Sequence, residues 1–160
     1  MLQIRDARAE DAAAACLVLR RSIIELCHAD HGNDPARLAQ WLRNKTPEIV
    51  ASWIATPGNS VLLAVEEEAI LGVGAVTDTG RITLNYVSPD ARFRGVSRAL
   101  VTALEERARA RGNASCTLSS TETARRFYHA LGYVAEAAPP GEAATSSGRP
   151  MGKRLAAPPG

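Results

Sequence analysis

The stretch RITLNYVSPDARFRGVSRAL, residues 81–100, joins an apolar run to an amphipathic pattern through a turn that is rich in arginine and small residues. Residues 81–88 predict a strand, and the helical spacing of apolar positions over residues 97–111 predicts a helix that Gly112 ends. A strand, a tight turn and a helix bring unpaired backbone N–H groups together at the positive end of the helix dipole. The turn therefore predicts a phosphate-binding site.

The residues of this turn fit a backbone cradle for an anion. Gly95 allows the backbone to approach a ligand closely, and the small side chains of Ser97 and Ala99 leave the amides accessible. Three arginines can neutralise charge at the rim: Arg92, Arg94 and Arg98. The plain alternative is a solvated basic turn whose glycine serves only its conformation.

Other nucleotide loops are excluded by their patterns. No G-x-x-x-x-G-K-[ST] occurs, and Gly72-Val73-Gly74 lies within a predicted strand without a third glycine. Nucleoside triphosphates and dinucleotides are thus disfavoured as ligands.

The composition is that of one ordinary globular domain. The chain has 160 residues, of which 46% are hydrophobic and 22% charged, and its formal charge of +2 lacks the basic excess of a nucleic-acid coat. Three cysteines in apolar or helical contexts favour reduced, buried thiols. No signal peptide or membrane-spanning run is evident, so the sequence predicts a cytoplasmic protein without a membrane partner.

Along the chain, strands and helices alternate in a pattern typical of an α/β domain. Strands are predicted at residues 2–8, 60–67, 69–78, 81–88, 114–120, 133–137 and 150–155. Helices are predicted at residues 10–27, 36–44, 48–56, 97–111 and 122–130. The hairpin spacing of residues 60–88 predicts antiparallel pairing, and the composition of residues 138–149 predicts a loop.

Two motifs in this order resemble the GNAT superfamily of acyl-CoA-dependent N-acyltransferases. The family's V-x-P followed by [RQ]-x-x-G-x-[GA] is similar to Val87-Ser88-Pro89 and the run 94–99, RGVSRA, with Ser97 in the usual glycine position. The family's N-x-x-A-x-x-[FL]-Y-x-x-x-G-[FY] is similar to TETARRFYHALGY, residues 121–133, with Thr121 in place of asparagine. The likeness extends over almost the whole chain and is weakest at residues 20–57.

The resemblance implies a single GNAT-type domain at residues 1–155, with residues 156–160 as a frayed tail. It implies a mixed, mostly antiparallel sheet flanked by helices, with a splay between the fourth and fifth strands that holds acetyl-CoA as co-substrate. The implied cofactor-binding residues are Tyr86, Val87, Arg92, Arg94, Gly95, Val96, Ser97, Arg98, Ala99 and Thr121. Tyr128 is implied as the general acid that protonates the departing thiolate, although its alternative is a core tyrosine beside Phe127.

The acceptor implied by the resemblance is an amine on a small molecule or a peptide. Glu25 and Asn85 are candidates to take its proton or to position a water, but each is also explained as a structural polar group. Cys27, His28, Asp30 and His31 lack the ligand spacing of a structural zinc site, so no metal is expected.

Two other classes of function are weighed against the enzyme. One is a non-catalytic sensor of acyl-CoA, and the other is a toxin that acetylates aminoacyl-tRNA. An aromatic content of 4% offers little surface for stacking bases, which makes nucleic acid an improbable partner. A homodimer is compatible with the sequence.

Overall fold

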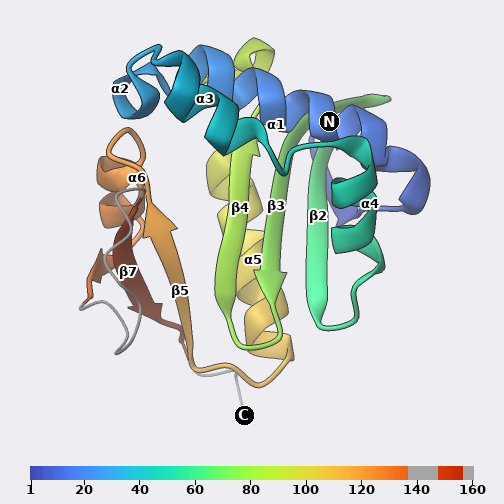
Figure 1. Ribbon diagram of the computed structural model, residues 1–160. Coiled ribbons are helices and arrows are strands. Elements are labelled where there is room, and N and C mark those ends of the chain that lie inside the picture. Colours follow the sequence, from blue (N-terminus) through green and yellow to red (C-terminus); the bar gives the residue numbers. More distant parts are fainter. Residues whose placement is uncertain (137–147, 157–160) are drawn as a thin grey trace.

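Seven strands form one sheet in the computed structural model, which describes residues 1–136 and 148–156 (Figure 1). The strands are β1 (Gln3–Asp6), β2 (Asn59–Glu66), β3 (Ala69–Thr77), β4 (Arg81–Val87), β5 (Ser115–Ser120), β6 (Val134–Ala135) and β7 (Arg149–Arg154). The helices are η1 (Ala9–Asp11), α1 (Ala12–Leu26), α2 (His28–His31), α3 (Pro35–Leu42), α4 (Pro47–Ala55), η2 (Pro89–Ala91), α5 (Val96–Ala110) and α6 (Arg125–Ala130). Most of the predicted loop at 138–149 and of the predicted tail at 156–160 lies outside the described residues.

The sheet has the order β1-β2-β3-β4-β5-β7-β6. Strands β1 to β4 pair antiparallel, β4 and β5 pair parallel, and β7 pairs antiparallel with both β5 and β6. Helix α5 connects the two parallel strands, as a crossover between parallel strands requires. The predicted single α/β domain with a mixed, mostly antiparallel sheet is confirmed.

The parallel pair β4–β5 separates soon after it begins. Only Arg81↔Thr117 and Ile82↔Leu118 are paired, although β4 continues to Val87 and β5 to Ser120. Figure 1 shows the two strands diverging toward the end of the sheet that α1 and α3 cover. The predicted splay is therefore present, and it leaves backbone N–H and C=O groups of β4 without a partner strand on one side.

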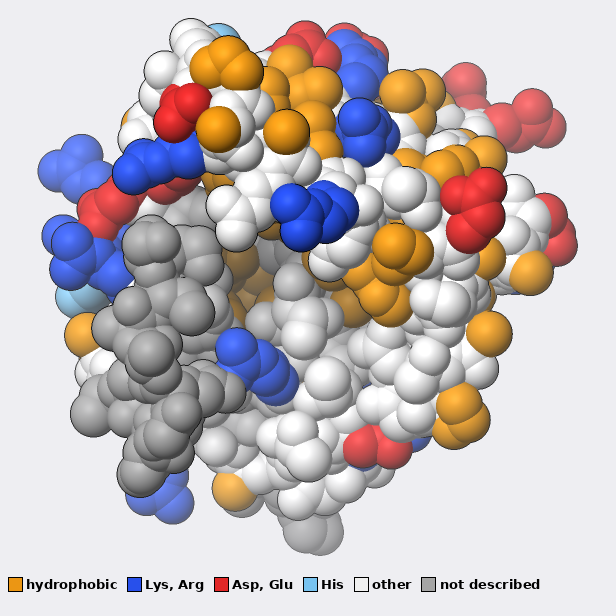
Figure 2. Space-filling model, in the orientation of Figure 1, with side chains coloured by type: hydrophobic (Ala, Val, Ile, Leu, Met, Phe, Trp, Pro, Cys, Tyr) orange, Lys and Arg blue, Asp and Glu red, His pale blue; other side chains and the backbone are white. Residues whose placement is uncertain are grey.

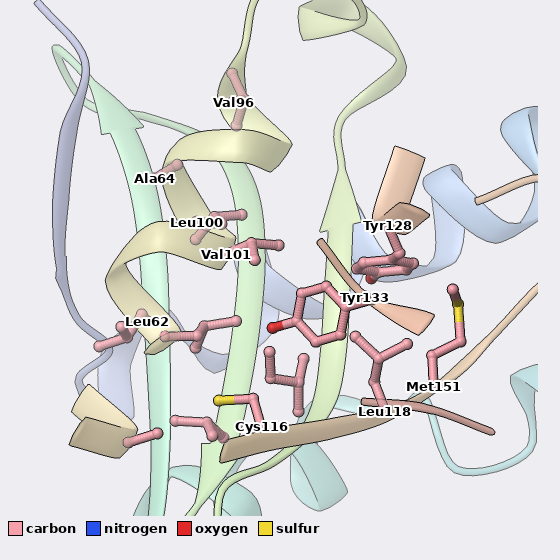
Figure 3. Packing of buried hydrophobic residues seen from close by; sticks show 14 of the residues in the cluster. Leu62, Ala64, Val96, Leu100, Val101, Cys116, Leu118, Tyr128, Tyr133 and Met151 are labelled. Carbon is pink, nitrogen blue, oxygen red and sulfur yellow. The ribbon is translucent and has the colours of Figure 1, made fainter. Parts of the chain in front are cut away.

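Helices cover both faces of the sheet. Alternate residues of β2 point to opposite faces, so that Leu63 packs with Leu19 and Val50 beneath α1 and α4, while Leu62 packs with Leu100 beneath α5. Figure 3 shows the α5 side, where the buried residues of β5 and of the segment after α6 continue the same core. The splay thus opens between two packed layers.

Local sequence signals explain where several helices begin. The side chains of Asp34 and Thr46 accept hydrogen bonds from Ala36 and Ile49, and a proline follows each cap, as predicted. Within the described residues, no helix has both the length and the apolar character to cross a membrane.

The predicted helix at 122–130 begins only at Arg125. The backbone N–H groups of Glu122 and Thr123 bond to the carboxylate of Asp30, and that of Ala124 bonds to the hydroxyl of Thr121. These side-chain bonds hold the three residues in a turn before the helix starts.

Candidate active site

A cavity of about 440 Å³ occupies the splay between β4 and β5. Its lining combines the open half of β4 with the start of α5, the turn before α6 and the last turn of α1. Figure 2 shows this face of the molecule hollowed near its middle, with hydrophobic side chains inside the hollow. Lining residues that the sequence predicted are Tyr86, Val87, Arg92, Gly95, Val96, Ser97, Arg98, Thr121 and Tyr128.

The start of α5 lines this cavity with uncapped backbone N–H groups. Gly95 takes the N-cap position with φ of 77°, in the left-handed region, and no side chain caps the helix. A Cβ placed on Gly95 would meet nothing within 4 Å. The first N–H groups of α5 are therefore open to the cavity at the positive end of the helix dipole.

The left-handed conformation of Gly95 favours a second register of the predicted loop motif. The motif resemblance placed Ser97 in the glycine position. Ser97 is the second residue of α5 and does not have a left-handed backbone conformation. With Gly95 as the motif glycine, the pattern [RQ]-x-x-G-x-[GA] begins at Arg92 instead of Arg94, and Ser97 takes the small-residue position. Repeated arginines in this stretch allow both registers, and only the backbone conformation distinguishes them.

The three arginines of the loop have different surroundings. Arg92 and Arg98 line the cavity, and the guanidinium of Arg92 lies 4.5 Å from the ring centre of Phe93. Arg94 does not line the cavity; its Nη2 lies 2.8 Å from a carboxylate oxygen of Glu66, at the end of β2. Ala99 is likewise absent from the lining, one turn further into α5.

Tyr128 brings its hydroxyl to the cavity from α6. The side chain is buried, and its hydroxyl oxygen accepts a hydrogen bond of 3.0 Å from the amide Nδ2 of Asn85 in β4. Burial raises the pKa of Tyr128, and the Asn85 hydrogen bond partly opposes that rise. The phenol is thus held protonated at neutral pH.

The neighbouring Tyr133 differs from Tyr128 because its hydroxyl donates its proton to an acceptor within the protein. Its ring lies 5.7 Å from that of Tyr128 (Figure 3), but its hydroxyl donates to the carboxylate of Glu105 at 2.8 Å. Lys153 also bonds to Glu105, so the proton of Tyr133 is part of a partly buried hydrogen-bond network within the protein. Tyr128 has no such acceptor among the described residues.

Thr121 supports the turn that precedes α6. Its hydroxyl oxygen accepts the backbone N–H of Ala124 at 3.2 Å, which leaves the hydroxyl proton available to a ligand in the cavity.

The other candidates from the sequence have structural partners. The ring nitrogens of His31 contact the carbonyl of Ile23 and the N–H of Asn33, and Asp30 bonds to the turn before α6. Burial raises the pKa of Cys27 to about 12, which makes it a poor thiolate ligand. Among the described residues, no three His, Cys, Asp or Glu side chains gather as a metal site.

Glu25 and Asn85 differ in their relation to the cavity. Glu25 pairs with Arg21 at 3.0 Å on the surface of α1 and does not line the cavity. Asn85 does line it, as expected of a candidate site residue, but its contact with Tyr128 is a role that the sequence did not indicate. The only available signal was a polar residue in the strand shortly before the V-x-P motif.

Comparison of the sequence with protein-family models identifies the class of protein that has this splayed sheet and cavity. Residues 29–155 match the family model described as "Acetyltransferase (GNAT) domain". The chain belongs to the GNAT acetyltransferase family. A search of curated proteins found no significant match.

Solved structures agree with this assignment over nearly the whole chain. The fold is similar to that of PaiA N-acetyltransferase from Thermoplasma acidophilum, solved in complex with coenzyme A, with a TM-score of 0.82, 18% identity and coverage of 97% of this chain and 99% of that one. A GCN5-related N-acetyltransferase from Rhodopseudomonas palustris matches with a TM-score of 0.82 and 26% identity over 96% and 95% of the two chains. A phosphinothricin acetyltransferase from Sinorhizobium meliloti, in complex with acetyl-CoA, matches with a TM-score of 0.66 and 19% identity over 96% and 88%.

Proposed function

We propose that this protein transfers an acetyl group from acetyl-CoA to a primary amine by direct attack of the amine on the thioester. The observation that carries the proposal is the hydroxyl of Tyr128, which reaches the cavity of the splay with its proton uncommitted, while the uncapped start of α5 opens to the same cavity. The acetyltransferase domain comprises residues 1–155.

The residues of the cavity fit acetyl-CoA. The open N–H groups at the start of α5 suit a pyrophosphate, and Arg92 and Arg98 add positive charge beside them. The unpaired groups of β4 near Tyr86 and Val87, together with the hydroxyl of Thr121, suit the amide-containing arm. Two of the similar structures described above contain coenzyme A or acetyl-CoA, which supports this choice of ligand.

Tyr128 supplies the proton that the reaction requires. Acetyl-CoA provides an activated acetyl group whose transfer releases a thiolate, and a thiol has a pKa of about 8.5 against about 10 for a free phenol. For free groups, transfer of a proton from a phenol to a thiolate is uphill by about 2 kcal/mol. This cost is small for a general acid that already forms a hydrogen bond to the thiolate. Tyr128 is in its acid form at neutral pH, as any phenol is, and the burial that raises its pKa adds to the cost of full proton transfer.

The described lining of the cavity offers no carboxylate and no histidine to accept the proton of the amine. An amine attacks a thioester only in its neutral form, and the neutral fraction increases tenfold with each unit that the pH rises, as long as the pH stays below the pKa of the amine. Turnover at subsaturating amine should accordingly increase between pH 7 and pH 8.

An amine panel assayed with acetyl-CoA tests the proposal. Thiol release should require both acetyl-CoA and an accepted amine, and mass spectrometry should find the product heavier by one acetyl group. Binding of acetyl-CoA without turnover for any amine, peptide or aminoacyl-tRNA would instead indicate a sensor. Acetylation confined to aminoacyl-tRNA would indicate the toxin activity.

A further inference from the structure

Three polar side chains form a chain of hydrogen bonds across the cavity, from α5 through β4 to α6. The hydroxyl of Ser97 donates to the amide oxygen of Asn85 at 3.2 Å, and the amide nitrogen of Asn85 donates to the hydroxyl oxygen of Tyr128 at 3.0 Å. All three residues line the cavity. The amide group of Asn85 thus connects α5 to Tyr128, the proposed acid, through hydrogen bonds.

Asn85 reaches both partners because of its place in β4. It lies opposite Gly74 in the β3–β4 pair, and a Cβ on Gly74 would meet Leu104 and Leu100 of α5. Cross-strand neighbours share a face, so Asn85 points to the α5 side, while the adjacent Tyr86 packs toward the layer of α1 and α4. The splay removes the neighbouring strand at this level, and the amide can therefore span from α5 to α6.

The direction of these bonds decides what happens to the phenol proton. An amide nitrogen carries two donors and no acceptor, so the Nδ2 of Asn85 uses a lone pair of Tyr128 and leaves its proton free. The opposite orientation of the amide would place the oxygen of Asn85 against Tyr128 and consume that proton, as Glu105 consumes the proton of Tyr133. The structure has the first orientation, with the hydroxyl of Ser97 donating to the amide oxygen; a hydroxyl can also accept, so this bond accompanies the orientation without imposing it.

We propose that Asn85 is a positioning residue for Tyr128: its amide nitrogen donates to the phenol oxygen while its amide oxygen accepts from Ser97, and this arrangement leaves the phenol proton to the ligand in the cavity. The inference deepens the proposed function and rests on it only for its catalytic consequence. The hydrogen-bond polarity itself is measurable without turnover.

The polarity is tested by the carbon-13 chemical shift of the tyrosine Cζ, which reports whether a phenol donates or accepts a hydrogen bond. The chain has three tyrosines, and the loss of one signal in Tyr128→Phe identifies Tyr128. Tyr133 is an internal reference for a phenol that donates to a carboxylate. We expect Asn85→Asp to move the Tyr128 signal toward that of Tyr133, because a carboxylate can only accept. An unchanged Tyr128 signal in Asn85→Asp and Asn85→Leu would overturn the inference.

Turnover tests the consequence. Asn85→Leu keeps the size of the side chain but loses both bonds, and it should lower kcat about tenfold with little change in the Kd of acetyl-CoA. Asn85→Asp should lower kcat about 10²-fold, because it adds an acceptor for the phenol proton. Ser97→Ala removes only the bond to the amide oxygen, so it should lower kcat less than Asn85→Leu does.

A double variant separates positioning from general disturbance of the site. In a Tyr128→Phe background no phenol proton remains to be directed, so adding Asn85→Asp should lower kcat no further. Independent losses that multiply in the double variant, or wild-type kcat in Asn85→Asp, would refute the positioning role. Wild-type kcat in Tyr128→Phe would instead refute the proposed acid, whatever the chemical shifts of the Asn85 variants.

Discussion

At the scale of single residues, the hydroxyl of Tyr128 matters because it accepts a hydrogen bond from Asn85 and keeps its own proton for a ligand. Tyr128→Phe retains the ring and its packing against Tyr133 but removes the proton donor. We expect kcat to decrease about 10²-fold or more, as when other positioned general acids are removed, with little change in melting temperature or in the Kd of acetyl-CoA. Steady-state kinetics, thermal unfolding and calorimetry measure the three quantities.

Tyr86→Phe is the matched control, because Tyr86 also lines the cavity but from the other face of β4. Its kcat should decrease much less than that of Tyr128→Phe. A core tyrosine without a catalytic role predicts the reverse pattern for Tyr128→Phe: a loss of about 1 kcal/mol in stability with turnover near that of the wild type.

The loop arginines should contribute unequally to binding. Arg92→Ala and Arg98→Ala should each weaken acetyl-CoA binding about tenfold or more, because each removes a cation from the cavity beside the start of α5. Arg94→Ala should change the Kd less than threefold, because Arg94 pairs with Glu66 outside the cavity. Isothermal titration calorimetry gives the three affinities, and a loss for Arg94→Ala as large as for Arg92→Ala would restore the motif register that begins at Arg94.

The register of the loop motif and the contact of Asn85 with Tyr128 could not be predicted from the sequence, for physical reasons. A motif fixes spacing, but the run 92–98 contains arginine at three positions and small residues at two, so that spacing alone permits two registers. The backbone angle of Gly95 depends on how α5 packs against the sheet and is invisible in the motif. The contact of Asn85 with Tyr128 joins residues far apart in the chain and required the folded sheet.

At the scale of elements, Asp30 joins α2 to the turn before α6, next to the opening of the splay. Its carboxylate accepts from the N–H groups of Glu122 and Thr123 and from the hydroxyl of Thr123. Asp30→Ala should leave these groups to water, so that the amides of residues 122 and 123 exchange with deuterium faster and stability decreases by about 1 kcal/mol. Hydrogen exchange followed by NMR resolves the two amides.

Glu106→Ala is a suitable comparison for Asp30→Ala. Glu106 is also an exposed carboxylate, but it pairs with Arg109 within α5 and links no second element. Such a pair contributes little, so this variant should keep the wild-type exchange at residues 122 and 123. Equal exchange at residues 122 and 123 in both variants would show that Asp30 does not fasten this turn.

Elements with local signals were predicted well from the sequence. The caps and prolines at Asp34-Pro35 and Thr46-Pro47 and the apolar spacing of α5 each act within one helix. The short α2 and the delayed start of α6 were missed, since Asp30 and the turn it holds stabilise each other across the fold. The splay was implied only by the resemblance to the family, because strand pairing depends on distant parts of the chain.

At the scale of the whole molecule, three buried thiols should set the alkaline limit of stability. Burial raises the pKa of Cys27 to about 12 and that of Cys116 to about 11, and it also raises the pKa of Cys16. An unfolded thiol has a pKa of about 8.5, so above that pH the unfolded chain releases protons that the folded protein keeps. The stabilisation is complete below about pH 8.5 and decreases as the pH rises toward the folded pKa values, by up to about 1.4 kcal/mol per pH unit for each thiol.

Urea unfolding under reducing conditions between pH 7 and pH 10 measures this dependence. Cys116→Ala should be less stable at pH 7 because it leaves a cavity, yet its stability should decrease less steeply above pH 8.5 because one titrating group is gone. A free energy of unfolding that stays constant from pH 8.5 to pH 10 would contradict the attribution of the alkaline loss of stability to the buried thiols.

The separation of β4 from β5 also has a kinetic consequence. Because the gap arises from the pairing of the two strands themselves, we expect acetyl-CoA to enter it without a separation of strands. Stopped-flow mixing with acetyl-CoA should therefore give a single phase whose rate increases linearly with concentration, without the plateau of a slow opening step. Because Arg92 and Arg98 line the cavity, that rate should decrease as salt is added, so that diffusion and charge govern how fast acetyl-CoA binds.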